Sequence, residues 1–391
     1  MTKKRINRTH HIGNNIDEVS FKTNTVTAMK RATIILTCVL ATVTVAAQKP
    51  NFTINGISVP KHTKNGTVIR LSDEQTMDSV ASGVVRKGKF TIEGYTDTVF
   101  VGWISGTNNI QLPIVVEPGM SATLDTRNYI IGGTPLNDQM NRFVHGYQYY
   151  RHLRDHYYYS FNNKMCDLYQ DSMNYFNRIV AWQILNDNAD NVVGAYMMSK
   201  IMGLMVERGD YYHDTTNSMC KRADSIYATA SPVVRNYLSV RKAYERGEHQ
   251  KSVAKGNRFV DFNGIERATH ETVSLSQLIA GHVAIVDFWA SWCGPCRQEI
   301  KQYLKPLYEK YADSGLVIIG VGVWDFEDEF DDAIKKVDIP YTQIIDLAKA
   351  SPTLYGFTSI PQVFLIDSDG TILGNFRGEE LIREVEWALQ K

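Results

Sequence analysis

One tetrapeptide constrains the fold of this 391-residue chain more than any other feature: the CGPC sequence of Cys293–Cys296. It lies between an apolar run typical of a buried strand, Ala284–Trp289, and a segment with helical spacing, Cys296–Tyr311. We therefore expect Cys293 at the N-terminus of a helix, where free N–H groups and the helix dipole stabilise a thiolate. Cys296, one turn later, lies on the same side. The two thiols can then form a disulfide that opens and closes again.

The alternatives for this pair are a structural disulfide and half of a metal site. A structural zinc site needs four ligands, and therefore a second cysteine pair or nearby histidines. The sequence offers neither, because the other cysteines, Cys38, Cys166 and Cys220, are far from Cys293 and Cys296 along the chain. We therefore favour a redox-active pair and expect no metal.

A carboxylate stands six residues before the first cysteine. Asp287 lies within the apolar strand Val286–Trp289, and a charged group in a buried strand is costly unless it has a partner or a task. We expect it beneath the helix, facing Cys296, where it would take up a proton when the second thiol attacks. The alternative is an ordinary aspartate at a strand end, paired or solvated.

Strands and helices alternate through the last third of the chain. The predicted elements are a strand over Leu316–Val323, a helix over Glu327–Lys336, a hairpin of Gln362–Ile366 and Thr371–Phe376, and a closing helix over Glu379–Leu389. Pro361 precedes the first hairpin strand and cannot donate a ladder hydrogen bond there; a cis bond between Ile360 and Pro361 fits such a turn. Residues 251–391 are therefore expected to form an α/β layer architecture around a central sheet.

Two stretches of this region resemble a known family. Val286–Cys296, VDFWASWCGPC, resembles the active-site segment of thioredoxin, and Tyr355–Asp367 resembles the cis-proline segment of the TlpA/ResA-like thiol–disulfide oxidoreductases. Trp324–Asp346 matches in placement the helix–strand insertion that separates that family from plain thioredoxin. The resemblance covers residues 255–391. It implies a thioredoxin fold and an activity in disulfide exchange.

The resemblance also implies roles for single residues. Cys293 is the expected nucleophile, Cys296 the resolving thiol, Pro361 the substrate-facing cis-proline and Asp287 the buried acid. Such enzymes need no dissociable cofactor, and their electrons come from a partner, here expected to be a membrane reductase. The substrates are expected to be protein or small-molecule thiols and disulfides. Four neighbouring residues are expected to form the surface that binds them: Trp292, Gly294, Pro295 and Ile360.

One position departs from the thioredoxin pattern. Thioredoxins carry a kinking proline five residues after the second cysteine, where this chain has Lys301. The only proline of this helix is Pro306, and a proline bends a helix where it sits. The bend is therefore expected later than in thioredoxin.

Two regions precede the cysteine-bearing one. Residues 50–126 are rich in β-formers separated by turn signals, which predicts a small antiparallel sandwich or open barrel; we place this β-domain at residues 48–134. It resembles the β-domain often fused to such reductases in Bacteroidetes. The predicted strands include Thr67–Leu71, Lys89–Glu93, Thr98–Ile104 and Pro113–Val116. Residues 135–250 show helical periodicity and predict a helical domain, with a cap at Leu136–Asp138 and a last helix from Pro232 to Glu248.

Three features of the helical region invite a functional interpretation. His152 and His156 are four apart and could share a metal, but no third ligand is evident. Cys166 and Cys220 are not at redox spacing, so we expect them to be dispensable for disulfide reduction, although they could pair structurally. An aromatic cluster could form a binding surface, and we favour a core or an interdomain seam. Its members are Tyr147, Tyr149, Tyr150, Tyr157, Tyr158, Tyr159 and Phe161.

The N-terminal segment resembles an export signal. Basic residues at 30–31, the apolar run Ala32–Ala47 and its small-residue end predict a secretory signal peptide over residues 29–47, with cleavage before Gln48. An uncleaved membrane anchor is the alternative. Cys38 lies inside the run and lacks the small preceding residue of a lipidation site. Residues 1–28 are interpreted as an extension ahead of a start at Met29.

Charge and composition exclude some functions. Lys+Arg and Asp+Glu are equal at 42 each, and residues 1–47 hold seven of the basic and two of the acidic residues, so the remainder carries about −5. This balance gives no reason to expect nucleic-acid binding. The pattern favours a secreted disulfide reductase of the periplasm or cell envelope, soluble or peripherally associated after cleavage. The alternatives are a disulfide oxidase or isomerase, and a binding scaffold with a residual thioredoxin domain.

Overall fold

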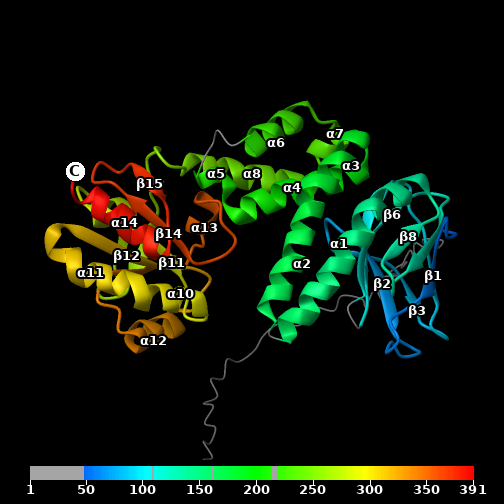
Figure 1. Ribbon diagram of the computed structural model, residues 1–391, viewed down its shortest axis with the longest axis horizontal. Helices are drawn as coiled ribbons and strands as arrows, with labels where there is room; N and C mark the ends of the chain where they lie inside the picture. Colours follow the sequence, from blue (N-terminus) through cyan, green and yellow to red (C-terminus); the bar gives the residue numbers. More distant parts are fainter. Residues whose placement is uncertain (1–47, 108–109, 161, 214–217) are drawn as a thin grey trace, which may run out of the picture. The chain divides into compact units, whose positions relative to one another are not determined.

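A computed structural model describes residues 48–107, 110–160, 162–213 and 218–391 (Figure 1). Along the sequence these residues form a β-region, a helical region and an α/β region, as the multidomain prediction required. No helix in this described part is long and apolar enough to cross a membrane. The expected signal peptide at residues 29–47, the extension at residues 1–28 and Cys38 lie outside the described residues.

Two four-stranded sheets form the β-region and share one hydrophobic core. Their strand orders are β4-β1-β7-β8 and β3-β2-β5-β6. The strands are β1 (Phe52–Ser58), β2 (Val68–Asp73), β3 (Ser79–Val84), β4 (Phe90–Gly94), β5 (Phe100–Ser105), β6 (Gln111–Val116), β7 (Ser121–Asp125) and β8 (Ile130–Gly132). The four predicted strands are confirmed to within two residues at each end. The antiparallel prediction is wrong for one pair: β1 and β7 run parallel, because the chain returns to the first sheet after β6 rather than through a hairpin.

The helical region contains eight α-helices and one π-helical turn within its described residues. They are α1 (Pro135–Tyr159), α2 (Asn163–Tyr175), the π-turn η1 (Phe176–Val180), α3 (Ala181–Asp187), α4 (Val192–Arg208), α5 (Asp210–His213), α6 (Ser218–Thr229), α7 (Pro232–Arg235) and α8 (Leu238–Ser252). The expected cap at residues 136–138 is wrong: Thr134 caps α1, and Pro135 takes the first helical position. The Asn137 side chain is buried instead and bonds both backbone groups of Val115 on β6.

The helix predicted from Pro232 to Glu248 is interrupted. It divides into α7 and α8 because Tyr237 has an extended backbone conformation. The Tyr237 hydroxyl donates to Glu74 at 2.7 Å, and the backbone N–H of Leu238 donates to Gln75. Both acceptors follow strand β2, so contacts with the β-region interrupt a helix that local propensity alone would continue.

Some rings of the aromatic cluster are exposed to solvent, and others pack against a neighbouring helix. Tyr149, Tyr158 and Tyr159 are exposed, whereas Tyr150 and Tyr157 stack on Tyr169 of α2. Tyr150 and Tyr157 therefore pack between α1 and α2 within the helical region, and these contacts do not form an interdomain seam. Phe161 lies outside the described residues.

The two histidines of α1 contact aromatic rings. His152 lies beside Tyr129, and His156 lies edge-on to Tyr157. Among the residues that the structure describes, no group of three or more His, Cys, Asp or Glu side chains could hold a metal ion.

The α/β region is built on one seven-stranded sheet of order β10-β9-β13-β12-β11-β14-β15. Its strands are β9 (Asn263–Glu266), β10 (Thr272–Ser274), β11 (Val283–Trp289), β12 (Leu316–Gly322), β13 (Gln343–Ile345), β14 (Gln362–Ile366) and β15 (Ile372–Asn375). Its helical elements are α9 (Leu275–Ile279), α10 (Gly294–Glu299), the π-turn η2 (Ile300–Leu304), α11 (Lys305–Tyr311), the 3₁₀ turn η3 (Ala312–Ser314), α12 (Glu327–Val337), α13 (Ser351–Leu354) and α14 (Gly378–Ala388). The predicted strands and helices of this region are confirmed, and α12 with β13 forms the expected insertion.

Alternating residues of the central strand β11 enter two different cores. Ile285 and Trp289 pack with α10, η2, α11, α12 and α14, whereas Val286 and Phe288 pack on the opposite face. That second core also contains Tyr212 of α5.

Residues from the helical region complete this second core. The Tyr212 hydroxyl donates to the backbone oxygen of Tyr355 at 2.6 Å, and the Gln250 amide donates to the backbone oxygen of Gly356 at 2.9 Å. Both pairs cross the predicted domain boundary at residue 251. The two regions therefore share a core at this boundary, and the boundary itself stays a prediction.

Candidate active site

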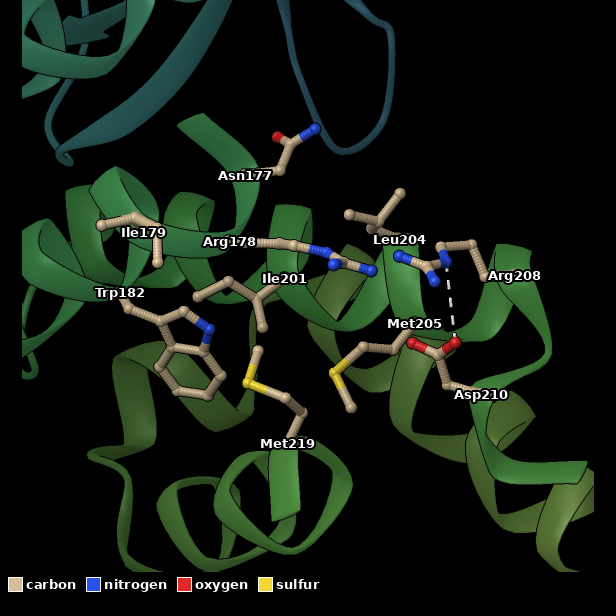
Figure 2. A pocket seen from close by; sticks show the side chains of 10 residues that line it. All are labelled: Asn177, Arg178, Ile179, Trp182, Ile201, Leu204, Met205, Arg208, Asp210 and Met219. Carbon is tan, nitrogen blue, oxygen red and sulfur yellow. Dashed lines mark ion pairs between the residues drawn. The ribbon is translucent and has the colours of Figure 1, made fainter. Parts of the chain in front are cut away.

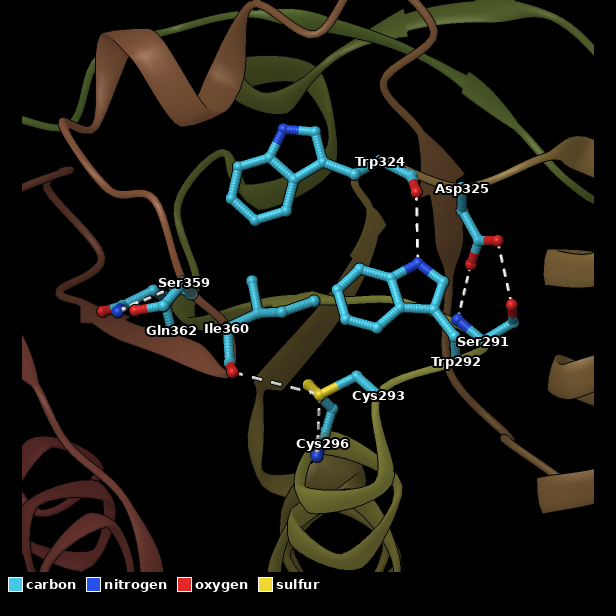
Figure 3. The surroundings of a disulfide bond; sticks show 9 residues. All are labelled: Ser291, Trp292, Cys293, Cys296, Trp324, Asp325, Ser359, Ile360 and Gln362. Atoms are coloured by element: carbon cyan, nitrogen blue, oxygen red, sulfur yellow. Dashed lines mark hydrogen bonds between the residues drawn. A yellow bond between two sulfur atoms is a disulfide. The ribbon is translucent and has the colours of Figure 1, made fainter. Parts of the chain in front are cut away.

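The two cysteines occupy the start of α10, directly after the central strand. Cys293 is the N-cap residue, and its Sγ accepts a hydrogen bond from the backbone N–H of Cys296 at 3.2 Å. The two sulfurs are joined in a disulfide, with the Cα atoms 5.3 Å apart (Figure 3). Cys293 retains 4% exposure and Cys296 none. Attack by a molecule from solution is therefore open to Cys293 alone.

The helix that carries the pair departs from α-geometry after its second turn. α10 passes into the π-turn η2, which leads into α11, where Pro306 occupies one of the first positions. Lys301, at the usual thioredoxin proline position, lies inside the π-turn. The expectation of a bend later than in thioredoxin is therefore wrong, because the π-turn begins before Pro306 and includes the usual proline position. Cys296 is fully buried in spite of this distortion.

A tryptophan and a hydrogen-bonded loop form one rim of the disulfide. Trp292 is 58% exposed, and its Nε1 donates to the backbone oxygen of Trp324 at 3.1 Å. Ser291 donates to the Asp325 carboxylate from both its backbone N–H and its hydroxyl. These bonds, drawn in Figure 3, tie the residues before Cys293 to the loop before α12. Sequence reasoning missed Trp324 and Asp325, because no local pattern links segments so far apart.

The proline segment forms the opposite rim. The peptide bond between Ile360 and Pro361 is cis, as the family resemblance implied. The carbonyl oxygen of Ile360 lies 4.0 Å from the Cys293 Sγ, although the two residues are 67 positions apart (Figure 3). Pro361 is buried and leads into β14, and Gly294 and Pro295 are exposed at the start of α10. The structure thus brings Cys293, Trp292 and Ile360 to one surface.

Asp287 lies beneath this surface, in the middle of β11. It alternates with Ile285 and Trp289, so its side chain points to the face of the sheet that Cys296 also packs against. It is fully buried, and neither carboxylate oxygen has a hydrogen-bond partner among the described residues. Burial first, and then the nearby charge of Glu299, raises the pKa of Asp287 well above its usual range. The alternative of a paired or solvated aspartate is therefore wrong.

A second buried polar group without a partner among the described residues lies in the core that contains Cys296. The Tyr341 hydroxyl is buried without a partner in the described chain. Burial, and then the charge of Asp287, raises its pKa well above the usual tyrosine range. Tyr341 gave no signal in sequence analysis, because it stands in a loop.

A missing side chain makes room beside the carboxyl. Gly320 on β12 pairs directly with Asp287, and a Cβ atom there would meet the Gln343 amide at 2.2 Å. The Gln343 Oε1 accepts from the Trp289 Nε1 at 2.9 Å, and its Nε2 donates to the Tyr341 backbone oxygen at 3.3 Å. A glycine inside an apolar strand often marks such a close approach, and this signal could have identified the position from sequence.

Two acidic residues of α12 and two further cysteines show no contact with the disulfide among the described residues. Glu327 forms an ion pair with Arg267 at 2.7 Å, and Glu329 is exposed on α12. Cys166 on α2 and Cys220 on α6 form no disulfide. Asp287, unlike Glu327 and Glu329, is fully buried.

Comparisons with known proteins agree with this geometry. Residues 254–389 match the Redoxin family model. The thiol-disulfide oxidoreductase ResA of Bacillus thuringiensis subsp. konkukian is 31% identical over 111 residues, which are 28% of this chain and 64% of ResA. The thiol:disulfide interchange protein HelX of Rhodobacter capsulatus is 31% identical over 99 residues, 25% of this chain and 53% of HelX. The chain thus spans less than two thirds of the length of these relatives.

A solved structure is similar over the same part of the chain. The thioredoxin domain of a thiol-disulfide oxidoreductase from Bacteroides vulgatus has 28% sequence identity and a TM-score of 0.32, and the match covers 34% of this chain and 96% of that domain. The family match, the ResA relatives and the strand–CGPC–helix arrangement all fall on the α/β region. Residues 254–389, here called the Redoxin domain, therefore match the Redoxin family and are related in sequence to the ResA-type thiol–disulfide oxidoreductases.

Proposed function

We propose that this protein is a thiol–disulfide oxidoreductase that reduces disulfide bonds of proteins in the cell envelope. One observation carries the proposal: two cysteines share a disulfide at the start of a helix, with the outer sulfur at the surface and the inner one closed to solvent. A purely structural disulfide has no need of a cis-proline loop against its outer sulfur or of a buried acid beneath it.

The reaction starts from the reduced pair. The Cys293 thiolate, stabilised by the free N–H groups of α10, attacks one sulfur of the substrate disulfide. A new bond forms between Cys293 and the substrate, and the other substrate sulfur leaves as a thiolate. The exposed ring of Trp292 and the backbone of Ile360 flank the attacking sulfur and position the substrate.

The second step resolves the mixed disulfide. The Cys296 thiol gives its proton to the Asp287 carboxylate as its sulfur attacks Cys293. The bond between Cys293 and the substrate breaks, the second substrate sulfur leaves as a thiolate, and the internal disulfide forms. Two electrons pass from the cysteine pair to the substrate, so the pair must then be reduced by a partner, which we infer to be a membrane reductase.

The reducing direction rests on the dipeptide between the cysteines. Gly294-Pro295 is the dipeptide of thioredoxin, whose potential of about −270 mV favours reduction of other disulfides.

The resemblance of residues 29–47 to a signal peptide supports an envelope location. If that location is right, envelope-fraction protein begins at Gln48 on N-terminal sequencing. An intact Met1 or Met29 in that fraction would contradict it.

Trapping of substrates tests the activity directly. In Cys296→Ala, the first step still forms the mixed disulfide, but no thiol remains to resolve it, so substrates stay attached until reductant is added. Cys293→Ser is the matched control, since a hydroxyl without an activating base is a poor nucleophile. Adducts from envelope extracts are separated on non-reducing gels and identified by mass spectrometry.

The two classes of function give different results. An oxidoreductase yields discrete cysteine-bearing proteins with Cys296→Ala and none with Cys293→Ser. A binding scaffold yields the same non-covalent partners from the unmodified chain and both variants, without any reductant-sensitive adduct. That second result would overturn the proposal.

A further inference from the structure

A cavity in the helical region is separate from the redox site. It has a volume of about 310 Å³ and lies between η1, α3, α4, α5 and α6 (Figure 2). This volume is at the lower end of the range of small-molecule sites. Its walls are mostly apolar: Trp182, Ile201 and Met205 are buried there, and Ile179, Leu204 and Met219 complete them.

One polar atom in this wall lacks a partner. The Trp182 side chain is buried, with 3% exposure, and its Nε1 has no hydrogen-bond acceptor among the described residues. Figure 2 shows this nitrogen on the side of the indole that faces the cavity, toward Ile201. The Arg222 guanidinium lies over the indole ring at 4.2 Å and is itself a donor, so it cannot accept this hydrogen bond. A buried donor without an acceptor is costly, and an acceptor inside the cavity would remove that cost.

Positive charge lines the same cavity. Arg178 comes from η1 and Arg208 from the end of α4 (Figure 2). Arg208 lies 3.6 Å from the Asp210 carboxylate, whereas Arg178 has no ion-pair partner in the described residues. Since Asp210 offsets one of the two guanidinium groups, the lining carries a net charge of +1.

Local backbone geometry places Arg178 here. η1 is a π-turn between α2 and α3, and it supplies Asn177, Arg178 and Ile179 to the wall. A π-turn shifts the direction of the side chains that follow it and is found frequently at functional sites. Neither η1 nor the following helix α3 contains a proline, so a missing backbone N–H does not explain the π-turn.

We propose that this cavity binds an amphipathic monocarboxylate, a molecule with an apolar body and one anionic end. The apolar body packs against the Ile201, Met205 and Met219 side chains. A carboxylate oxygen accepts from the Trp182 Nε1, and the charge is neutralised by Arg178. The inference is independent of the redox chemistry, because none of these residues belongs to the α/β region.

Nitrogen resonances of the tryptophan side chains offer a direct test. The full chain has six tryptophans, so labelling with ¹⁵N-tryptophan gives six indole N–H signals, and Trp182→Phe identifies the one from Trp182. Decanoate is the probe, and decanol is the uncharged control of equal chain length. We expect decanoate to shift the Trp182 signal in a saturable way, and to leave the signals of Trp289 and Trp292 in place.

Charge recognition is tested by one pair of variants. Arg178→Gln should weaken decanoate binding by about tenfold or more, since it removes a charged hydrogen-bond partner, and should leave decanol binding unchanged. Arg235→Gln makes the same charge change at an exposed position outside the cavity and should change neither. Absence of a saturable shift at Trp182, or equal decanoate affinity in Arg178→Gln and Arg235→Gln, would overturn the proposal.

Discussion

The Redoxin domain and the helical region each contain a π-turn near a buried polar group without a partner. In the Redoxin domain η2 follows the cysteine helix, and the unpartnered groups include the Asp287 carboxyl. In the helical region η1 lines the cavity, and the unpartnered groups include the Trp182 indole N–H. The two sites look alike in backbone geometry and in burial, but they differ in what the group can do.

The difference lies in proton chemistry. A carboxyl group exchanges its proton, so burial changes the pH at which it works and makes it useful in a reaction. An indole N–H is a donor only and keeps its proton at every pH that a protein meets. Under the two proposals above, a similar structural irregularity therefore serves catalysis in one region and recognition in the other, according to the side chain that is buried.

The largest effect is expected from the outer cysteine. Cys293→Ser should abolish the reduction of insulin or glutathione disulfide, because the attacking thiolate is lost. The double variant Cys166→Ser/Cys220→Ser is the matched control in the helical region, and it should keep the activity of the unmodified chain. Turnover assays on both folded variants measure this contrast. Loss of activity in the double variant, with its fold intact, would mean that the helical region shares in the redox chemistry.

The next effect concerns the buried acid. Asp287→Asn keeps the shape of the side chain but cannot accept the Cys296 proton, so resolution should slow by about 100-fold near neutral pH. Since burial raises the pKa of Asp287, the rate of the unmodified chain should rise with pH as this carboxyl ionises. Stopped-flow measurement of mixed-disulfide decay across pH tests both points. If the rate and its pH profile are unchanged in the variant, water or another base takes the proton.

The same carboxyl should reduce stability. Leucine has the branching and heavy-atom number of aspartate, so Asp287→Leu removes an unsatisfied polar group without creating a cavity and should stabilise the fold by about 1–3 kcal/mol. The unfolded carboxyl titrates near pH 3.9 and the folded one well above it. Between these values the folded state binds the extra proton, so the stability of the unmodified chain falls as pH rises.

Hydrogen exchange measures this effect within the full chain. Protection of the β11 and β12 amides in the oxidised protein should fall with rising pH, after correction for the intrinsic exchange rate. In Asp287→Leu this fall should be absent, so the advantage of the variant grows with pH. A variant that is less protected than the unmodified chain at every pH would contradict the assignment of Asp287 as an unpaired buried acid.

The smallest effect is expected in the helical region. Trp182→Phe removes the indole N–H but keeps an aromatic ring beneath Arg222. Disulfide turnover and its pH profile should stay as in the unmodified chain, because an indole does not titrate. The comparison of the two regions fails if this variant shifts the pH dependence of turnover.

Sequence reasoning reached the parts of the fold that local pattern determines. The strand before Cys293, the helix after it and the hairpin after Pro361 were predicted because burial pattern and turn residues are local signals. The burial of Asp287 also followed from its apolar neighbours. Local pattern missed the break at Tyr237, which a distant hydrogen bond to Glu74 explains.

The parts of the site that were missed depend on long-range contacts. Trp324 and Asp325 hold the residues before Cys293 from a loop more than 30 positions away. The Gln343 side chain reaches Trp289 across β12, where a Cβ atom on Gly320 would collide with its amide. Neither π-turn has a hydrophobic period that distinguishes it from an α-helix. These features depend on packing between distant segments, and a single sequence contains no local pattern that indicates such packing.

The unequal exposure of the two sulfurs also has a kinetic consequence. Any thiol that approaches the oxidised pair reaches Cys293 and not Cys296, so electrons enter and leave through the same atom. By microscopic reversibility, reduction of a substrate and oxidation of a substrate then pass through one common intermediate. Under the proposed function, the Cys293 sulfur therefore carries both half-reactions, and the potential of the cysteine pair relative to those of its partners decides the direction of net electron transfer.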